Sequence, residues 1–256
     1  MILALDIGNT HIVLGCIEGR KIINIARMAS DTLKTEHEYA VLMKQILELD
    51  NIDISTVEGG IISSVVPPLT GTLKKAIQRV TGHKPMVVGA GIKTGLNILI
   101  DNPAQLGSDL AVSAVAALNE YKPPIIAVDM GTATTIMVID KNGSFLGGQI
   151  LPGVALSMNA LASKTSQLPK VSIEAPKKVI GTNTIDSMKS GAVFGAASML
   201  DGMIDRIEEE IGMSATVVAT GGLSGSIVPH CKHEIICDDD LLLKGLAIIY
   251  EKNVKR

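Results

Sequence analysis

Two short segments of the sequence carry residue types that bind phosphate groups and metal ions. The first runs from Asp6 through Gly8, Asn9 and Thr10, and a second Asp-x-Gly segment begins at Asp129, just past the middle of the 256-residue chain. A carboxylate holds a metal ion directly or through water, and backbone N–H groups beside a glycine can approach phosphate oxygens closely. The pair therefore predicts that the protein binds a nucleotide together with magnesium.

The second segment adds Gly131, Thr132, Thr134 and Thr135 to the phosphate-binding candidates. A single Asp-x-Gly turn is a weak signal, because many hairpins contain one for conformational reasons alone. A repeat at half the chain length is a stronger signal. It predicts two domains of related topology that face each other across a nucleotide-binding cleft.

Two further segments have a possible functional interpretation beside a plain structural one. Gly221 and Gly222 follow an apolar strand, where a glycine pair either lets the backbone approach a nucleoside or simply forms a strand-to-helix turn. The polar loop 102–109 precedes an apolar helix, so Ser108 or Asp109 could cap that helix. Alternatively, Asp109 could be the base that accepts a proton from an attacking hydroxyl group.

The apolar pattern predicts an α/β protein in two parts, with a boundary at Pro123-Pro124. The expected domains are 1–122 and 123–256. The expected strands are 1–7, 11–17, 22–26, 61–66, 86–88, 125–128, 136–139, 145–150 and 217–219. The main expected helices follow Thr35-Glu36-His37-Glu38 and Pro152-Gly153, cover 73–80 and 110–118, and run over 184–211 and 241–252.

The composition excludes several classes of partner. The formal net charge is −3 with basic residues dispersed along the chain, and only 2% of residues are aromatic, so we expect no nucleic-acid partner. The sequence shows neither a signal-peptide pattern nor an apolar run of membrane-spanning length, so we expect a cytoplasmic protein without a membrane partner. Gly191 and Gly195 put small residues on one face of the long helix, which fits an intrachain contact and a dimer seam equally well.

A series of motifs along the whole chain resembles the type III pantothenate kinases. These proteins belong to the superfamily of acetate and sugar kinases, heat-shock proteins and actin. The resemblance implies two ribonuclease-H-like domains in tandem around a nucleotide cleft, as in actin-like ATPases. The motifs are Asp6–Thr10, Ser64–Pro67, Asn102–Asp109, Asp129–Thr135, Pro152-Gly153 with Leu168-Pro169, Gly181–Thr184, Thr220–Gly222 and Asp240–Leu246.

The resemblance also implies an activity, namely ATP-dependent phosphorylation of the 4′-hydroxyl of pantothenate, the first step toward coenzyme A. It implies a homodimer, Mg²⁺ and a monovalent cation, K⁺ or NH₄⁺. By position, Asp6 would serve magnesium and ATP, Thr10 and the turn Gly131–Thr134 would hold phosphates, and Asp129 would help to bind the monovalent cation. Gly8, Asn9, Gly221 and Gly222 complete the expected ATP site.

The remaining positions concern the phosphoryl acceptor. Asp109 matches the catalytic base of the family, Thr184 matches a pantothenate contact, and Gly107 and Ser108 lie in the same substrate loop. The family loop usually reads Gly-Ala-Asp-Arg, whereas this chain reads Gly107-Ser108-Asp109-Leu110, with Leu110 in place of the arginine. Because Leu110 cannot pair with an anionic substrate, a kinase for another hydroxylated metabolite stays open as an alternative. The second alternative is a non-catalytic regulator resembling the Bvg accessory factors.

Overall fold

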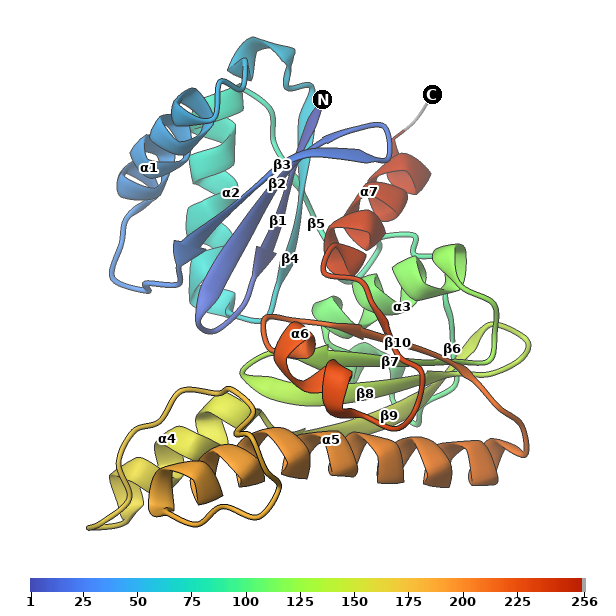
Figure 1. Ribbon diagram of the computed structural model, residues 1–256. Helices are drawn as coiled ribbons and strands as arrows, with labels where there is room; N and C mark the ends of the chain where they lie inside the picture. The colour runs from blue at the N-terminus through green and yellow to red at the C-terminus, as the bar shows by residue number, and fades with distance from the viewer. Residues whose placement is uncertain (255–256) are drawn as a thin grey trace. The chain divides into compact units, whose positions relative to one another are not determined.

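The structure is a computed structural model that describes residues 1–254, and it divides into two compact units (Figure 1). The first unit combines residues 1–96, residues 102–116 and the chain from Asp240 onward, and the second combines 97–101 with 117–239. This division differs from the expected domains 1–122 and 123–256 in three segments: residues 97–101 and 117–122 belong to the second unit, and the chain from Asp240 onward belongs to the first unit, where it packs with the N-terminal strands. The sequence pattern did not reveal this return of the chain.

The first unit is built on a five-stranded sheet of order β3-β2-β1-β4-β5. Helices α1 and α2 pack on one face of the sheet and α7 packs on the other. The apolar side chains of β1 point alternately to the two faces of the sheet. Leu3, Leu5 and Ile7 join the core under α1 and α2, whereas Ile2 and Ala4 join the core under α7. The elements are β1 (Ile2–Ile7), β2 (His11–Glu18), β3 (Lys21–Ala29), α1 (Glu36–Leu49), η1 (Ile54–Thr56), β4 (Gly59–Ser64), α2 (Pro67–Thr81), β5 (Met86–Val87), η2 (Pro103–Gln105), α3 (Ser108–Glu120) and α7 (Leu241–Asn253). Helix α3 belongs to this unit up to residue 116, and its last turn belongs to the second unit.

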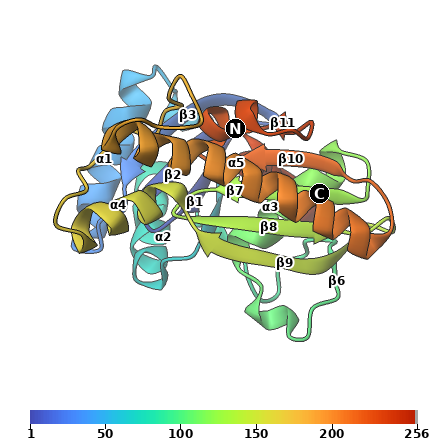
Figure 2. The same ribbon diagram turned by 60° about the horizontal axis from the view of Figure 1, so that its bottom comes forward.

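The second unit is built on a six-stranded sheet of order β11-β10-β7-β8-β9-β6. Figures 1 and 2 show α5 running along one face of this sheet, where its apolar side chains pack on β7, β8 and β10. The elements are β6 (Asn97–Ile98), β7 (Ile125–Met130), β8 (Ala133–Ile139), β9 (Ser144–Pro152), α4 (Val154–Lys164), α5 (Thr184–Ile211), β10 (Thr216–Thr220), α6 (Ser224–Ile227), η3 (Val228–His230) and β11 (Ile236–Cys237).

The two sheets repeat one topology, as the paired Asp-x-Gly segments predict. In each unit three antiparallel strands form a meander, β1-β2-β3 or β7-β8-β9, and a parallel strand, β4 or β10, lies on the other side of the first strand. Asp6 and Asp129 each stand one residue before the end of that first strand. The duplication inferred from the sequence is therefore present in the strand register.

Most expected elements are confirmed with shifts at their ends, the largest at α2, which begins at Pro67 where the sequence pattern predicts a start near residue 73. The capping box of α1 is complete, since Thr35 accepts a hydrogen bond from the Glu38 backbone and the Glu38 side chain accepts one from the Thr35 backbone. Helix α5 has the expected bounds. Among residues 1–254, no helix combines the length and the apolar character needed to cross a membrane.

Candidate active site

The first hairpin turn, between β1 and β2, presents the residues expected to hold phosphate. The Gly8 N–H donates to the carbonyl of His11 at 3.0 Å, and this bond closes the turn so that Asn9 and Thr10 are exposed at its tip. Ser30, just after β3, supports the turn from behind. Its backbone N–H donates to the Thr10 carbonyl at 3.0 Å and its hydroxyl donates to the Gly8 carbonyl at 2.5 Å.

The second hairpin turn, between β7 and β8, has the same construction with one residue fewer. The Gly131 N–H donates to the carbonyl of Ala133 at 3.0 Å, and Gly131 and Thr132 are exposed. Gly153, just after β9, takes the place of Ser30 and donates its N–H to the Thr132 carbonyl at 3.1 Å. A Cβ on Gly153 would lie 2.3 Å from that carbonyl oxygen, so the close contact requires glycine.

Asp129 lies between two threonines at the end of β7. Its register partners are Thr135 on β8 and Thr220 on β10, and directly opposed residues of neighbouring strands share a face of the sheet. The hydroxyl oxygen of Thr135 is buried and has no hydrogen-bond partner among the described residues. A buried polar atom without a partner costs free energy, so its presence beside a carboxylate indicates a site for a ligand that oxygen atoms bind.

The Gly221 turn packs directly against Asp129. Gly221 has a φ of +95°, and a Cβ at this position would lie 2.6 Å from Oδ1 of Asp129 and 2.7 Å from the Met130 backbone nitrogen. Gly222 has no such neighbour, since a Cβ there would meet no atom within 4 Å. The buried Ser224 hydroxyl donates to the Gly221 carbonyl at 2.8 Å and thereby fixes the turn.

The loop 102–109 lies against the end of β4 in the first unit. The Ser108 hydroxyl donates to the Ser64 carbonyl at 3.0 Å and accepts from the Ser64 N–H at 3.1 Å. The hydroxyl of the fully buried Ser63 lies 3.3 Å from it. Because Ser63 is also the register partner of Asp6, the loop carrying Asp109 meets the carboxyl ends of the neighbouring parallel strands β1 and β4, where Asp6 lies.

Asp109 is half-buried in the first turn of α3. Its Oδ1 accepts the Leu110 N–H at 2.8 Å, and a Cβ on Gly107 would lie 2.5 Å from the same oxygen. Gly107 therefore leaves room for the carboxylate. The first hydrogen bond of α3 runs from the Ala111 N–H to the Gly107 carbonyl. The Ser108 hydroxyl bonds to Ser64 of β4 and therefore does not cap the helix.

Thr184 lies on the wall of a large cavity in the second unit. The cavity has a volume of about 910 Å³ and is walled by α4, α5, the ends of β8 and β9, and the segment 181–183 that leads into α5. Thr134 of the second hairpin turn also lines it. Gly181 is packed so closely that a Cβ would lie 2.4 Å from the Ser187 nitrogen, which fixes the entry to α5. The structure thus brings Thr134 and Thr184 to one cavity.

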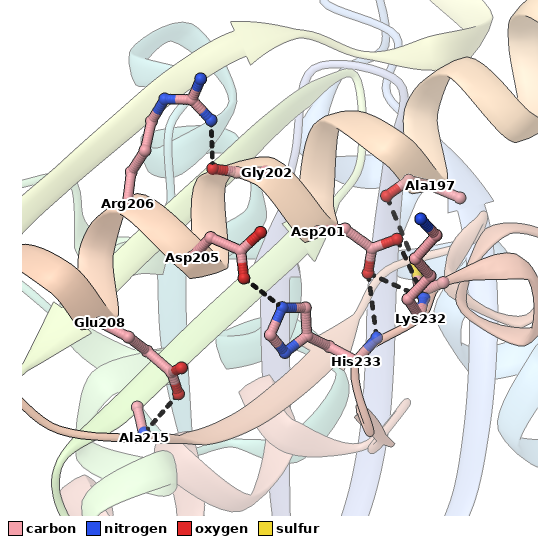
Figure 3. A network of polar contacts seen from close by, with 10 residues as sticks. Ala197, Asp201, Gly202, Asp205, Arg206, Glu208, Ala215, Lys232 and His233 are labelled. Carbon is pink, nitrogen blue, oxygen red and sulfur yellow. Dashed lines mark hydrogen bonds and ion pairs between the residues drawn. The ribbon is translucent and has the colours of Figure 1, made fainter.

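The segment after the Gly221 turn is held on α5 by a carboxylate (Figure 3). Asp201 is 9% exposed and accepts the backbone N–H groups of Lys232 at 2.9 Å and His233 at 3.0 Å. The His233 ring lies 2.8 Å from Asp205 on the same helix. This network anchors the connection between α6 and β11.

The three cysteines are unpaired thiols in different surroundings. Burial, with a smaller contribution from Asp50, raises the pKa of Cys16 to about 11. Burial and then Asp201 raise the pKa of Cys231 to about 11. Cys237 is exposed, and its pKa is raised mainly by partial burial.

Sequence reasoning missed the supporting roles of Ser30, Ser63 and Ser224, and it named Gly153 only as part of a family motif. Ser30, Ser63 and Gly153 act on a predicted motif from a distant part of the chain, whereas Ser224 lies three residues after Gly221, which it contacts. A signal was available for Ser30 and Gly153 only, because both follow the third strand of a meander, whose end must come close to the hairpin turn before the second strand.

A family model and a curated relative indicate one family, and solved structures share the fold. The family model described as "Type III pantothenate kinase" matches residues 2–206. A protein of that name from Exiguobacterium sp. is 43% identical over 255 residues, which cover 100% of both chains. A solved structure titled as a putative Baf family transcriptional activator from Campylobacter jejuni has a TM-score of 0.60 at 22% identity and covers 98% of both chains. A ROK family glucokinase from Streptomyces griseus has a TM-score of 0.50 at 14% identity over 98% of both chains, and shows the fold alone.

Proposed function

Because the chain belongs to the type III pantothenate kinase family, we propose that it transfers the γ-phosphoryl group of ATP to the 4′-hydroxyl of pantothenate with Asp109 as the base. One observation carries this proposal. The contact of Ser108 with Ser63 and Ser64 holds the loop of Asp109 at the carboxyl end of β4, next to the end of β1 where Asp6 lies. A kinase needs its base beside the groups that hold the phosphates. The cytoplasm, which supplies ATP, is the compartment proposed for the reaction.

The two hairpin turns are proposed to bind phosphate oxygens. In the first unit, Asn9 and Thr10 would supply backbone N–H groups and a hydroxyl. Gly8 shapes the turn through its N–H bond to His11, and the contacts of Ser30 hold that shape. Transfer of a phosphoryl group needs little covalent chemistry from the protein, so catalysis rests on positioning and on neutralising charge.

In the second unit, Gly131, Thr132 and Thr134 are proposed to contact ATP, together with Gly221 and Gly222. Glycine at 131 and 222 leaves the backbone accessible, because a Cβ would meet nothing within 3.5 Å at either position. Sequential hydroxyl and N–H donors at such a turn suit an anion.

The donor atoms present fit both proposed metal ions. Asp6 supplies carboxylate oxygens, which Mg²⁺ prefers, and a bound Mg²⁺ would neutralise charge on the phosphates. Asp129 and the unpartnered hydroxyl of Thr135 are oxygen ligands for a monovalent cation, K⁺ or NH₄⁺, which would offset negative charge near the phosphates. Aspartate and threonine are the chain's own contribution to these sites.

The acceptor is proposed to contact Gly107, Asp109 and Thr184. Asp109 accepts the hydroxyl proton as the new P–O bond forms, and Thr184 donates or accepts a hydrogen bond from the wall of its cavity. Leu110 provides no charge for the carboxylate of pantothenate, so another group must hold this end of the substrate.

A homodimer is also part of the proposal. Gly191 and Gly195 on α5 face open space, since a Cβ at either position would meet no atom within 4 Å among the described residues. Large apolar side chains are also exposed on α4 and α5, the two helices that wall the cavity with Thr184. Leu156 on α4 is 50% exposed and Ile185 on α5 is 49% exposed. A second copy of the chain would cover such a face.

The test of the catalytic assignment is Asp109→Asn. We expect the rate of pantothenate phosphorylation to fall by about 100-fold or more, as for loss of a general base, while ATP binding measured by calorimetry is retained. Asp101→Asn makes the same chemical change at an exposed residue nearby and should leave the rate unchanged. Full turnover by Asp109→Asn would remove this residue from the mechanism.

The acceptor and the cation are tested in the same assay. ATP consumption should depend on pantothenate, and consumption that only another small alcohol stimulates would favour the alternative suggested by Leu110. K⁺ should also raise the melting temperature of the wild-type protein more than Na⁺ does. Thr135→Val should remove this difference, because valine keeps the shape of threonine without its oxygen ligand.

A further inference from the structure

We propose that Ser108 is a positioning residue that clamps the loop carrying Asp109 to the end of β4, and that its hydroxyl does not bind the acceptor. This inference rests on the proposed function, in which Asp109 is the base. It also changes that proposal at one residue, because family position alone assigned Ser108 to the substrate.

The hydrogen-bonding capacity of the Ser108 hydroxyl is fully used within the first unit. A serine hydroxyl has one hydrogen to donate and two lone pairs to accept with. The hydrogen goes to the Ser64 carbonyl at 3.0 Å, and the lone pairs accept the Ser64 N–H at 3.1 Å and the Ser63 hydroxyl at 3.3 Å. A substrate contact would have to displace one of these partners.

The clamp ends on a well-anchored part of the fold. Ser63 and Ser64 are the last residues of β4, where Ser63 is fully buried and Ser64 is in register with Ile7 of β1. The Ser64 side chain accepts from Thr70 Oγ1 at 2.7 Å and from the Val66 N–H at 3.2 Å, which ties the same residue to the start of α2. Ser108 thus connects the loop to a strand end that neighbouring elements already fix.

The consequence concerns Asp109, the next residue along the chain. Its carboxylate is half-buried and close to the position that a Gly107 side chain would occupy, so small shifts of the loop move the carboxylate. General-base catalysis depends on a heavy-atom distance of about 2.6–3.2 Å to the acceptor hydroxyl, and small misplacements are costly. Ser108→Ala would free the loop from β4 without removing any atom that is proposed to contact the substrate.

The central experiment compares Ser108→Ala, Ser108→Thr and Ser113→Ala in the full-length protein. We expect Ser108→Ala to lower kcat about 10-fold with the KM for pantothenate and for ATP within about twofold of wild type. Ser108→Thr keeps the hydroxyl and should restore most of kcat. Ser113→Ala removes another buried hydroxyl of α3 and should leave kcat unchanged.

Hydrogen exchange supplies a readout that does not depend on activity. Amides of residues 102–110 should exchange at least about fivefold faster in Ser108→Ala than in wild type, whereas those of β1 should not change. If the wild-type protein failed to phosphorylate pantothenate, the proposed function would be lost but this comparison would still decide whether the clamp exists.

Three outcomes would overturn the inference. A raised KM for pantothenate with kcat unchanged would make Ser108 a substrate ligand, because the lost contact would have stabilised bound pantothenate and the transition state equally. Unchanged kinetics together with unchanged exchange in residues 102–110 would show that the hydroxyl positions nothing. A lower melting temperature with wild-type kcat would assign it a purely structural role and would equally refute the proposal.

Discussion

Substitution of the glycine pair after β10 should separate two residues that look alike in the sequence. Gly221 has a φ of +95°, which an L residue rarely adopts, and its Cβ would lie 2.6 Å from Oδ1 of Asp129. The backbone conformation alone should cost Gly221→Ala about 1–2 kcal/mol. The contacts with the Met130 backbone add about 1–3 kcal/mol, because backbone atoms cannot rotate away as a flexible side chain can.

The combined cost is about 3 kcal/mol, which for a chain of this size lowers the melting temperature by about 6–12 °C. Gly222→Ala is the matched control, since its Cβ meets no atom within 4 Å and it does not have a positive φ. It should change the free energy of unfolding by less than about 0.5 kcal/mol. Differential scanning fluorimetry gives the melting temperatures, and steady-state kinetics give the KM for ATP.

A second consequence follows because the Gly221 contact is with a carboxylate proposed to bind a cation. Gly221→Ala should displace Asp129, so the stabilisation by K⁺ should be lost along with the thermal stability. A melting temperature within about 2 °C of wild type, together with a normal response to K⁺, would refute the close packing on which this reasoning depends.

The remaining predictions concern the α5 network and the thiols. Asp201→Ala should lower the free energy of unfolding by about 2–3 kcal/mol in urea denaturation, because two backbone N–H groups lose a charged acceptor. Asp205→Ala removes only an exposed pair with His233 and should cost less than about 1 kcal/mol; equal costs would contradict the structure. A thiol reagent at pH 8 should label Cys237 first, because Cys237 is exposed, whereas burial shields Cys16 and Cys231 and raises the pKa of each to about 11. Faster labelling of Cys16 would show that β2 is not packed as described.

The local parts of the fold were predictable from the sequence, because they depend on neighbouring residues. The strand that leads to Asp6, the capping box at Thr35 and the long helix beginning at Thr184 each carry a periodic or capping pattern. The duplicated topology was predictable because the Asp-x-Gly segments recur.

Features that depend on distant parts of the chain were not predictable. Strand β6 has two residues and no period, and it forms only by pairing with β9. A serine at the start of a helix usually caps it, so nothing near Ser108 indicated that its hydroxyl would bond to Ser64. For Ser30 and Gly153 the sequence gives a position after the third strand of each meander, but their contacts with the hairpin turns follow only from the folded structure.

The path of the chain has a consequence for synthesis on the ribosome. Residues 97–101 and 117–239 complete the second unit before α7 has been made, whereas the first unit needs α7 to cover Ile2, Ala4 and Ile61. During translation β1 and β4 therefore keep one apolar face incompletely covered until α7 has been synthesised. Nascent chains stalled before α7 should be the species that chaperones hold and that aggregates most readily.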